Sequence, residues 1–195
     1  MANFANQHAF EDNSRRMASG VDLNPLNAIT DPQGNVLAYA QTGGMLSPQR
    51  HELRPGEKLF RFGGSGRSAQ QTATGGWWIA DTEFAKLEAF AQVHELSIGM
   101  AMRLLCLVPP EWSDATLLVR ARVARDLLAW RGIGNSVIIK PGKIGGVVSL
   151  PHQNDIAARR LHQLFIPGLS TVAALSVENS YPLTAEASRR GFLYL

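Results

Sequence analysis

One arginine, several glycines and four aromatic side chains occupy two short segments in an order that suits an anionic ligand with a flat ring. Residues 59–64 (LFRFGG) place Arg61 between phenylalanines, and residues 75–80 (GGWWIA) place paired tryptophans directly before an expected helix. An arginine can grip a phosphate or a ribose, glycines allow close backbone approach, and an aromatic face can stack on a heterocycle. The competing interpretation is that the aromatic residues alternate between core and surface, with Arg61 in an ordinary surface contact.

Other chemistries find little support in the residue spacing. The five histidines are far apart, with no i, i+4 pair and no close Cys/His spacing, so no metal centre is predicted. Residues 63–66 (GGSG) lack both the Lys-Ser/Thr of a phosphate loop and the dinucleotide fingerprint, and the chain has no Gly-x-Ser-x-Gly elbow. Cys106, the single cysteine, lies in an apolar run, which predicts a buried, inert thiol in a reducing compartment.

Three short strands, at 58–62, 76–80 and 162–166, are expected to position the arginine and the tryptophans. Between the first two, the loop from Gly63 to Thr74 is rich in Gly, Ser, Gln and Thr. Because it has no obvious apolar anchor, we predict that this loop is mobile without ligand. Such a loop suits either a lid over a nucleotide site or an idle surface segment.

Helical spacing of apolar residues appears in three segments. Residues 81–93 carry Phe84, Leu87 and Ala91 on one expected face, whereas residues 97–108 suit either a short helix or a strand. The longest helix is predicted within 113–131. Its apolar stripe consists of Leu117, Ala121, Ala124 and Leu128.

Length and composition indicate one globular unit. The chain has 195 residues, of which 45% are hydrophobic and 18% charged, which suits a single sizeable core. The predicted fold class is α+β, a compact single domain at 36–195 with short β-strands and two main helices. Residues 1–35, rich in turn formers and without sustained periodicity, are expected to form a loosely ordered N-terminal segment.

The net charge and the N-terminal sequence indicate which partners and which cellular compartment to expect. A net charge of +3 with Lys and Arg spread along the chain permits nucleic-acid binding but does not indicate it. Neither a signal peptide nor an apolar stretch of the ~20 residues that cross a bilayer is visible, so no membrane partner is predicted. We expect a cytoplasmic protein, with export by a signal-independent route left open and the oligomeric state unknown.

The order of the motifs resembles the ADP-ribosyltransferase superfamily, including its small bacterial toxins and effectors. In that family a first strand carries Arg or His, a second strand feeds a helix against which NAD is clamped, and a late strand supplies a Glu. Arg61 matches the first motif, and residues 76–85 (GWWIADTEFA) look like the second. Residues 161–168 (LHQLFIPG) look like the third.

The resemblance implies an ADP-ribosyltransferase-like fold and a NAD-dependent transferase that modifies a macromolecular target, most naturally a protein. NAD would be the substrate, and Arg61 and Gln163 would hold the catalytic positions. Contacts to NAD are implied for six residues of the first two motifs, namely Arg61, Phe62, Gly63, Gly76, Trp77 and Trp78.

Gln163 departs from the family pattern because it stands where the resemblance places the catalytic Glu. A carboxylate there orients the ribose and stabilises the positive charge that develops as nicotinamide leaves, whereas an amide forms hydrogen bonds but supplies no charge. Glu178 and Glu186 are later carboxylates outside the family motif. Whether the chain is an enzyme therefore stays open.

Two alternatives to a NAD-binding transferase remain. One is a non-enzymatic interaction or inhibitory protein on a degenerate version of the same fold, acting through exposed aromatics and a face formed by Arg120, Arg122 and Arg125. The other is a mildly basic nucleic-acid-binding factor, which rests only on the isoelectric point of about 9.4 and on arginines scattered along the chain.

Overall fold

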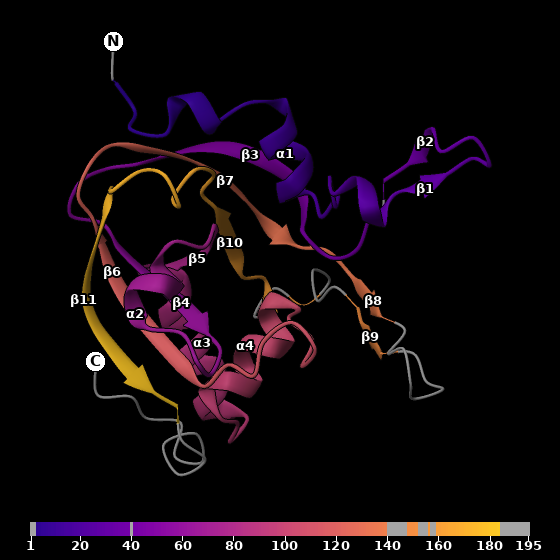
Figure 1. Ribbon diagram of the computed structural model, residues 1–195. Coiled ribbons are helices and arrows are strands. Elements are labelled where there is room, and N and C mark those ends of the chain that lie inside the picture. The colour runs from indigo at the N-terminus through magenta and orange to yellow at the C-terminus, as the bar shows by residue number, and fades with distance from the viewer. Residues whose placement is uncertain (1–2, 40, 140–147, 152–155, 157–158, 184–195) are drawn as a thin grey trace.

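A seven-stranded antiparallel sheet, flanked by a few helices, includes strands with β-branched and aromatic residues, such as Trp77–Ala80 (Figure 1). The computed structural model describes residues 3–39, 41–139, 148–151, 156 and 159–183. Among these residues no helix is long and apolar enough to cross a bilayer. The helices are α1 (Asp12–Ala18), α2 (Ala69–Ala73), α3 (Asp81–Val93) and α4 (Ile98–Cys106), with 3-10 turns at Gln7–Ala9 and Pro25–Asn27.

The large sheet has the strand order β11-β6-β4-β5-β10-β7-β3, and two further pairs, β1-β2 and β8-β9, lie outside it. Every neighbouring pair in the large sheet is antiparallel. The strand bounds are β1 (Ile29–Thr30), β2 (Val36–Ala38), β3 (Met45–Leu53), β4 (Lys58–Gly63), β5 (Trp77–Ala80), β6 (Leu117–Val123), β7 (Leu127–Gly134), β8 (Val137–Ile139), β9 (Val148–Leu150), β10 (His162–Phe165) and β11 (Leu175–Pro182).

The predicted strands at 58–62, 76–80 and 162–166 are confirmed as β4, β5 and β10, which are neighbours in the sheet. Strand β5 joins two parts of the sheet, since its last two residues pair with β4 and its first two pair with β10. The two residues of β5 that pair with β4 are therefore different from the two that pair with β10. The mixed α and β architecture agrees with the predicted fold class.

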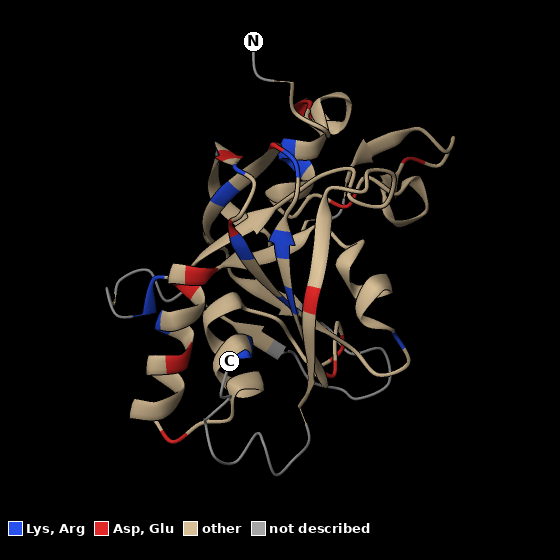
Figure 2. Ribbon diagram, turned by 90° about the vertical axis from the view of Figure 1, so that its left-hand side faces the viewer, with Lys and Arg blue, Asp and Glu red and all other residues tan. Residues whose placement is uncertain are grey.

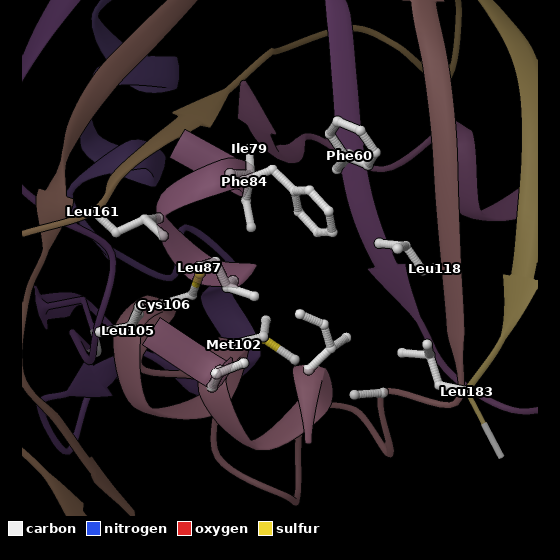
Figure 3. Packing of buried hydrophobic residues seen from close by; sticks show 14 residues of the cluster. Phe60, Ile79, Phe84, Leu87, Met102, Leu105, Cys106, Leu118, Leu161 and Leu183 are labelled. Carbon is white, nitrogen blue, oxygen red and sulfur yellow. The ribbon is translucent and has the colours of Figure 1, made fainter. Parts of the chain in front are cut away.

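The predicted helix at 81–93 is confirmed as α3, and its apolar face is buried as expected. Phe84 stacks on Phe60 of β4 with ring centroids 4.0 Å apart. Helix α4, capped by the Ser97 side chain, adds Met102 and Leu105 to the same core (Figure 3). The ambiguous segment at 97–108 is thus a helix, and it packs against α3.

The predicted longest helix within 113–131 is wrong, because this segment forms strands β6 and β7 and the turn between them. From Val119 to Val123, buried residues alternate with half-buried arginines, which is the period of a strand. Leucine and alanine spaced four apart satisfied a helical pattern as well. Pairing with distant strands decides the outcome, since β6 lies between β4 and β11, and β7 lies between β10 and β3.

The N-terminal residues contact the sheet through one buried amide. The Asn6 side chain donates to the carbonyls of Leu128 (2.8 Å) and Pro167 (2.9 Å) and accepts from the Leu128 N–H (2.8 Å). Nearby, Ser14 of α1 accepts a hydrogen bond from the Trp130 indole at 2.8 Å. The division into a segment at 1–35 and a domain at 36–195 stays a prediction.

Candidate functional site

A cavity of about 210 Å³ lies between strands β4, β5 and β10, the C-terminal end of α4 and the turn that follows this helix. Its walls are largely apolar, and their polar side chains come from an arginine, a glutamine and a serine. The lining residues are Gly44, Phe60, Arg61, Phe62, Trp77, Trp78, Ile79, Met102, Cys106, Leu107, Val108, Trp112, Ser113 and Gln163.

The cavity forms where the strands part. The ladder between β4 and β5 contains the pairs Leu59–Ala80 and Phe60–Ile79 and then stops, whereas Trp77 and Trp78 pair with β10 on the other edge of β5. Arg61 is the first residue of β4 beyond this ladder. Its Nη1 donates to the Trp77 carbonyl at 2.5 Å, so a side chain replaces the missing backbone contact between the two strands.

Arg61 is one of the residues that line this cavity, and the described lining includes no carboxylate that could balance its charge. Its Nε is fully buried and has no hydrogen-bond partner among the described residues. Burial, followed by repulsion from Arg67, lowers the pKa of Arg61 to about 10, so the guanidinium remains charged at neutral pH. A buried donor and a buried charge are both costly when unpaired. An anionic ligand group would relieve both costs.

Gln163 of β10 also lines the cavity and already has a contact within the fold. Its side chain is 7% exposed, and its Nε2 donates to the carbonyl of Cys106 at 3.1 Å. Cys106 ends α4, and the next residue, Leu107, adopts a left-handed conformation (φ 56°). The amide therefore satisfies one of the carbonyls that a helix C-terminus leaves open.

The paired tryptophans of β5 have different roles. Trp78 is almost completely buried, and its indole donates to the Gly75 carbonyl at 2.8 Å, which fixes the start of the strand. Trp77 is partly buried, and its ring is tilted against Phe165 at a centroid distance of 5.1 Å. Trp77 thus forms a supported aromatic wall, whereas Trp78 belongs mainly to the core.

The structure brings most of the predicted site residues together. Gly63 and Gly76 are the exceptions, because neither lines the cavity. An added Cβ would come 2.7 Å from Thr72 at Gly63 and 2.8 Å from Phe165 at Gly76, so both glycines serve close packing. The predicted residues that share the cavity are Arg61, Phe62, Trp77, Trp78 and Gln163. Their functional roles stay predictions.

The contribution of α4 and the turn after it was not anticipated from the sequence. Trp112 and Ser113 line the cavity from this turn, where an aromatic residue following two prolines was the available signal. Cys106 also lines it, and burial raises the pKa of its thiol to about 12. The thiol is therefore protonated at neutral pH, as expected for an inert cysteine.

Carboxylates are lacking from the cavity wall as far as the structure describes it. Glu178 lies on β11, where its carboxylate forms ion pairs with Arg120 and Arg122 of β6, while Glu186 falls outside the described residues. Of the predicted arginine face, Arg120 and Arg122 therefore lie on a strand and share one carboxylate, whereas Arg125 lies in the turn after that strand. Figure 2 shows acidic and basic residues interspersed over several elements. No group of His, Cys, Asp and Glu within the described ranges could hold a metal ion.

The loop after β4 is attached to the turn after α4. Both carboxylate oxygens of Asp114 accept from the Ser65 N–H, at 2.9 and 3.0 Å. A hydrogen bond from the Ser65 side chain, followed by this one from its N–H, lowers the pKa of Asp114. Further along, Ser68 caps the short helix α2. The loop is thus attached through Ser65 and through α2, which contacts β4, β6 and β11, and its mobility stays a prediction.

The chain matches no protein-family model and no curated protein. It is similar to a chain in the structure of Tne2 in complex with Tni2, with 11% identity, a TM-score of 0.43, and coverage of 70% of this chain and 92% of the other. A second similar chain comes from Rhs1-CT in complex with cognate immunity protein RhsI1, with 15% identity, a TM-score of 0.39, and coverage of 77% and 89%. Likeness at this level carries no functional argument, so the function has to be inferred from the cavity.

Proposed function

We propose that this chain is a NAD-binding, ADP-ribosyltransferase-like protein in which Arg61 holds an anionic group of the dinucleotide inside the cavity. The observation that carries the proposal is the Arg61 guanidinium, whose buried Nε has no hydrogen-bond partner among the described residues. The resemblance of the motifs to ADP-ribosyltransferases selects NAD among anionic ligands. It also suggests a bacterial effector or toxin that modifies a macromolecular target, most naturally a protein.

The walls of the cavity fit a ligand with a flat ring next to an anionic group. Trp77 and Phe62 supply partly buried aromatic surface to the lining that includes Arg61, and Gln163 supplies an amide to the same lining. Aromatic side chains favour stacked or edge contacts with ring systems, and a guanidinium binds phosphate through charge-assisted hydrogen bonds. These two kinds of contact are the ones that a nucleotide can use together.

The proposal also includes transfer of ADP-ribose from NAD to the target. This reaction depends on which polar groups line the cavity. Loss of nicotinamide builds positive charge on the ribose, which a carboxylate stabilises and a neutral amide does not. The Gln163 amide also donates to Cys106 within the fold. The second candidate, a non-enzymatic interaction protein of the same architecture, is therefore favoured by a cavity whose described lining holds no Asp or Glu.

Calorimetric titration with NAD tests the binding proposal. Arg61→Ala and Arg61→Met remove the charge, and Arg61→Met retains most of the aliphatic bulk. Each should weaken NAD binding by roughly ten- to a hundredfold, which is the range for loss of one charge-assisted hydrogen bond. Arg125→Ala is the matched control, because Arg125 is exposed in the turn between β6 and β7 and has the same charge.

Nicotinamide release, measured on the same samples, separates the two candidates. Release by the parent that disappears in Arg61→Ala supports the enzyme. Binding without release supports a non-enzymatic protein that retains the ligand site. Absence of NAD binding in the parent, or equal weakening by Arg61→Ala and Arg125→Ala, would overturn the proposal.

A further inference from the structure

Trp112 differs from the other aromatic side chains that line the cavity. The remaining four are buried or partly buried, whereas Trp112 is 49% exposed. Among the described residues, it forms neither a ring-ring contact nor a cation-π contact. A tryptophan with this much open surface beside a cavity is a natural platform for a ligand, because its large rigid ring loses little conformational entropy on binding.

The turn that carries Trp112 is fixed to the body of the protein at both ends. The Arg103 guanidinium of α4 donates to the carbonyls of Val108 at 3.3 Å and Ser113 at 2.6 Å. Within the turn, the Trp112 N–H donates to the Pro109 carbonyl at 3.1 Å. The backbone position of Trp112 is therefore set by contacts that do not involve a ligand.

One edge of the indole ring also has a defined neighbour. An added Cβ at Gly43 would come 2.9 Å from the Trp112 ring and 2.8 Å from the Val137 side chain. Gly43 is buried and has no side chain, so the edge of the Trp112 ring packs directly on its backbone. This packing holds one edge of the ring while about half of the side chain stays in solvent.

The volume of the cavity limits how much of a ligand it can enclose, and this limit indicates which part of the ligand would lie at Trp112. At about 210 Å³ the cavity is smaller than the roughly 300–1,000 Å³ of sites that enclose drug-sized molecules. A ring with its adjacent groups fits such a volume, but a nucleotide with a second ring does not. A dinucleotide gripped at Arg61 must therefore continue past the mouth of the cavity.

We infer that Trp112 is a ligand-binding residue that stacks on a heteroaromatic ring left outside the cavity when an anionic group occupies Arg61. The inference rests on the proposed function, and it deepens that function by dividing the ligand into an enclosed part and a stacked part. It predicts a preference for ligands in which a flat ring is linked to phosphate, over inorganic phosphates that lack a ring.

Paired titrations with NAD and with inorganic pyrophosphate test the inference. Trp112→Ala should weaken NAD binding by roughly five- to a hundredfold, the range for removal of one stacking contact. It should leave pyrophosphate binding within about twofold, whereas Arg61→Met should weaken both ligands. Trp112→Phe should retain most of the NAD affinity, and Val93→Ala, a truncation of an exposed side chain on α3, should change neither ligand.

Fluorescence supplies a readout that a purely structural role for Trp112 would not produce. Stacked NAD should quench tryptophan emission in the parent, and in Trp112→Phe the contribution of Trp112 to this quenching should disappear, leaving that of Trp77, although the ligand still binds. Unchanged NAD affinity in a folded Trp112→Ala variant would overturn the inference and leave the role of Arg61 intact. Equal loss of NAD and pyrophosphate in Trp112→Ala would also contradict stacking. Absence of NAD binding in the parent would overturn the inference together with the proposed function.

Discussion

Gln163→Glu should destabilise the protein, although the resemblance to ADP-ribosyltransferases would place a carboxylate at this position. The substitution removes the amide that donates to the Cys106 carbonyl at 3.1 Å. An unpaired buried carbonyl costs about 1–3 kcal/mol. A negative charge at the C-terminal end of α4 adds ~0.3–1 kcal/mol, because the helix dipole is negative there. The expected loss is about 1–4 kcal/mol, or about 3–16 °C in Tm for a chain of this length.

The pH dependence of this loss identifies its cause. Burial should raise the pKa of the introduced carboxyl above its unfolded value of about 4.3, since position 163 is only 7% exposed. A carboxyl with a raised folded pKa stabilises the protein at low pH, and that contribution is lost as the pH rises through the folded pKa. The deficit relative to the parent should therefore be larger at pH 8 than at pH 5.

Thermal unfolding of the parent, Gln163→Glu and Gln163→Met at both pH values is the assay. Gln163→Met has a similar length but neither donor nor charge, so its deficit should not change with pH. A Gln163→Glu variant as stable as the parent at pH 8, or a deficit of equal size at pH 5 and pH 8, would refute the structural assignment of the amide. In that case the carboxylate position of the family would be accessible to this chain.

Three further outcomes follow from individual contacts. Asn6→Ala should lower the free energy of unfolding by about 2–4 kcal/mol in denaturant titrations, because it leaves buried backbone groups unpaired; an unchanged midpoint would contradict docking of the N-terminal residues. Burial opposes ionisation of Glu83, but hydrogen bonds from the His162 N–H and Lys86 hold its pKa below the usual value. Its stabilisation is therefore lost as the pH falls through that pKa, and Glu83→Gln should flatten the acid limb of stability against pH. Hydrogen exchange over residues 63–74 should slow with saturating NAD, and unchanged fast exchange would count against a lid.

Sequence patterns within single segments predicted the strands and the helix next to the cavity better than they predicted how the strands pair in the sheet. Strands β4, β5 and β10 are short, largely apolar runs next to turn residues, and α3 has apolar residues at helical spacing, so their positions followed from neighbouring residues alone. Strand β6 did not, because Leu117 and Ala121 fit a helical stripe as well as a strand, and pairing with β4 and β11 decided between them. Strand pairings between distant segments leave no local signal.

The residues of the candidate site also divide into those that the sequence indicated and those that depend on tertiary packing. The sequence indicated Arg61 and the paired tryptophans because their residue types are unusual together, and a resemblance to a known family indicated Gln163. The contact between Gln163 and Cys106 could not be anticipated, since it depends on how the end of α4 meets β10. Trp112 was missed for a similar reason, because it reaches the cavity only through the packing of its turn against Gly43.

The claim that Arg61 binds the anionic part of the ligand can be tested at the atom concerned. In a ¹H–¹⁵N spectrum of the arginine side chains, the Nε–H signal of Arg61 is identified by its absence in Arg61→Lys. Because this Nε is buried without a partner among the described residues, a charge-assisted hydrogen bond to NAD should move its signal downfield and slow its exchange with water. Titration to saturation with NAD should produce that shift, with the signal of Arg125 unchanged. A signal that does not move when NAD is bound would contradict the account.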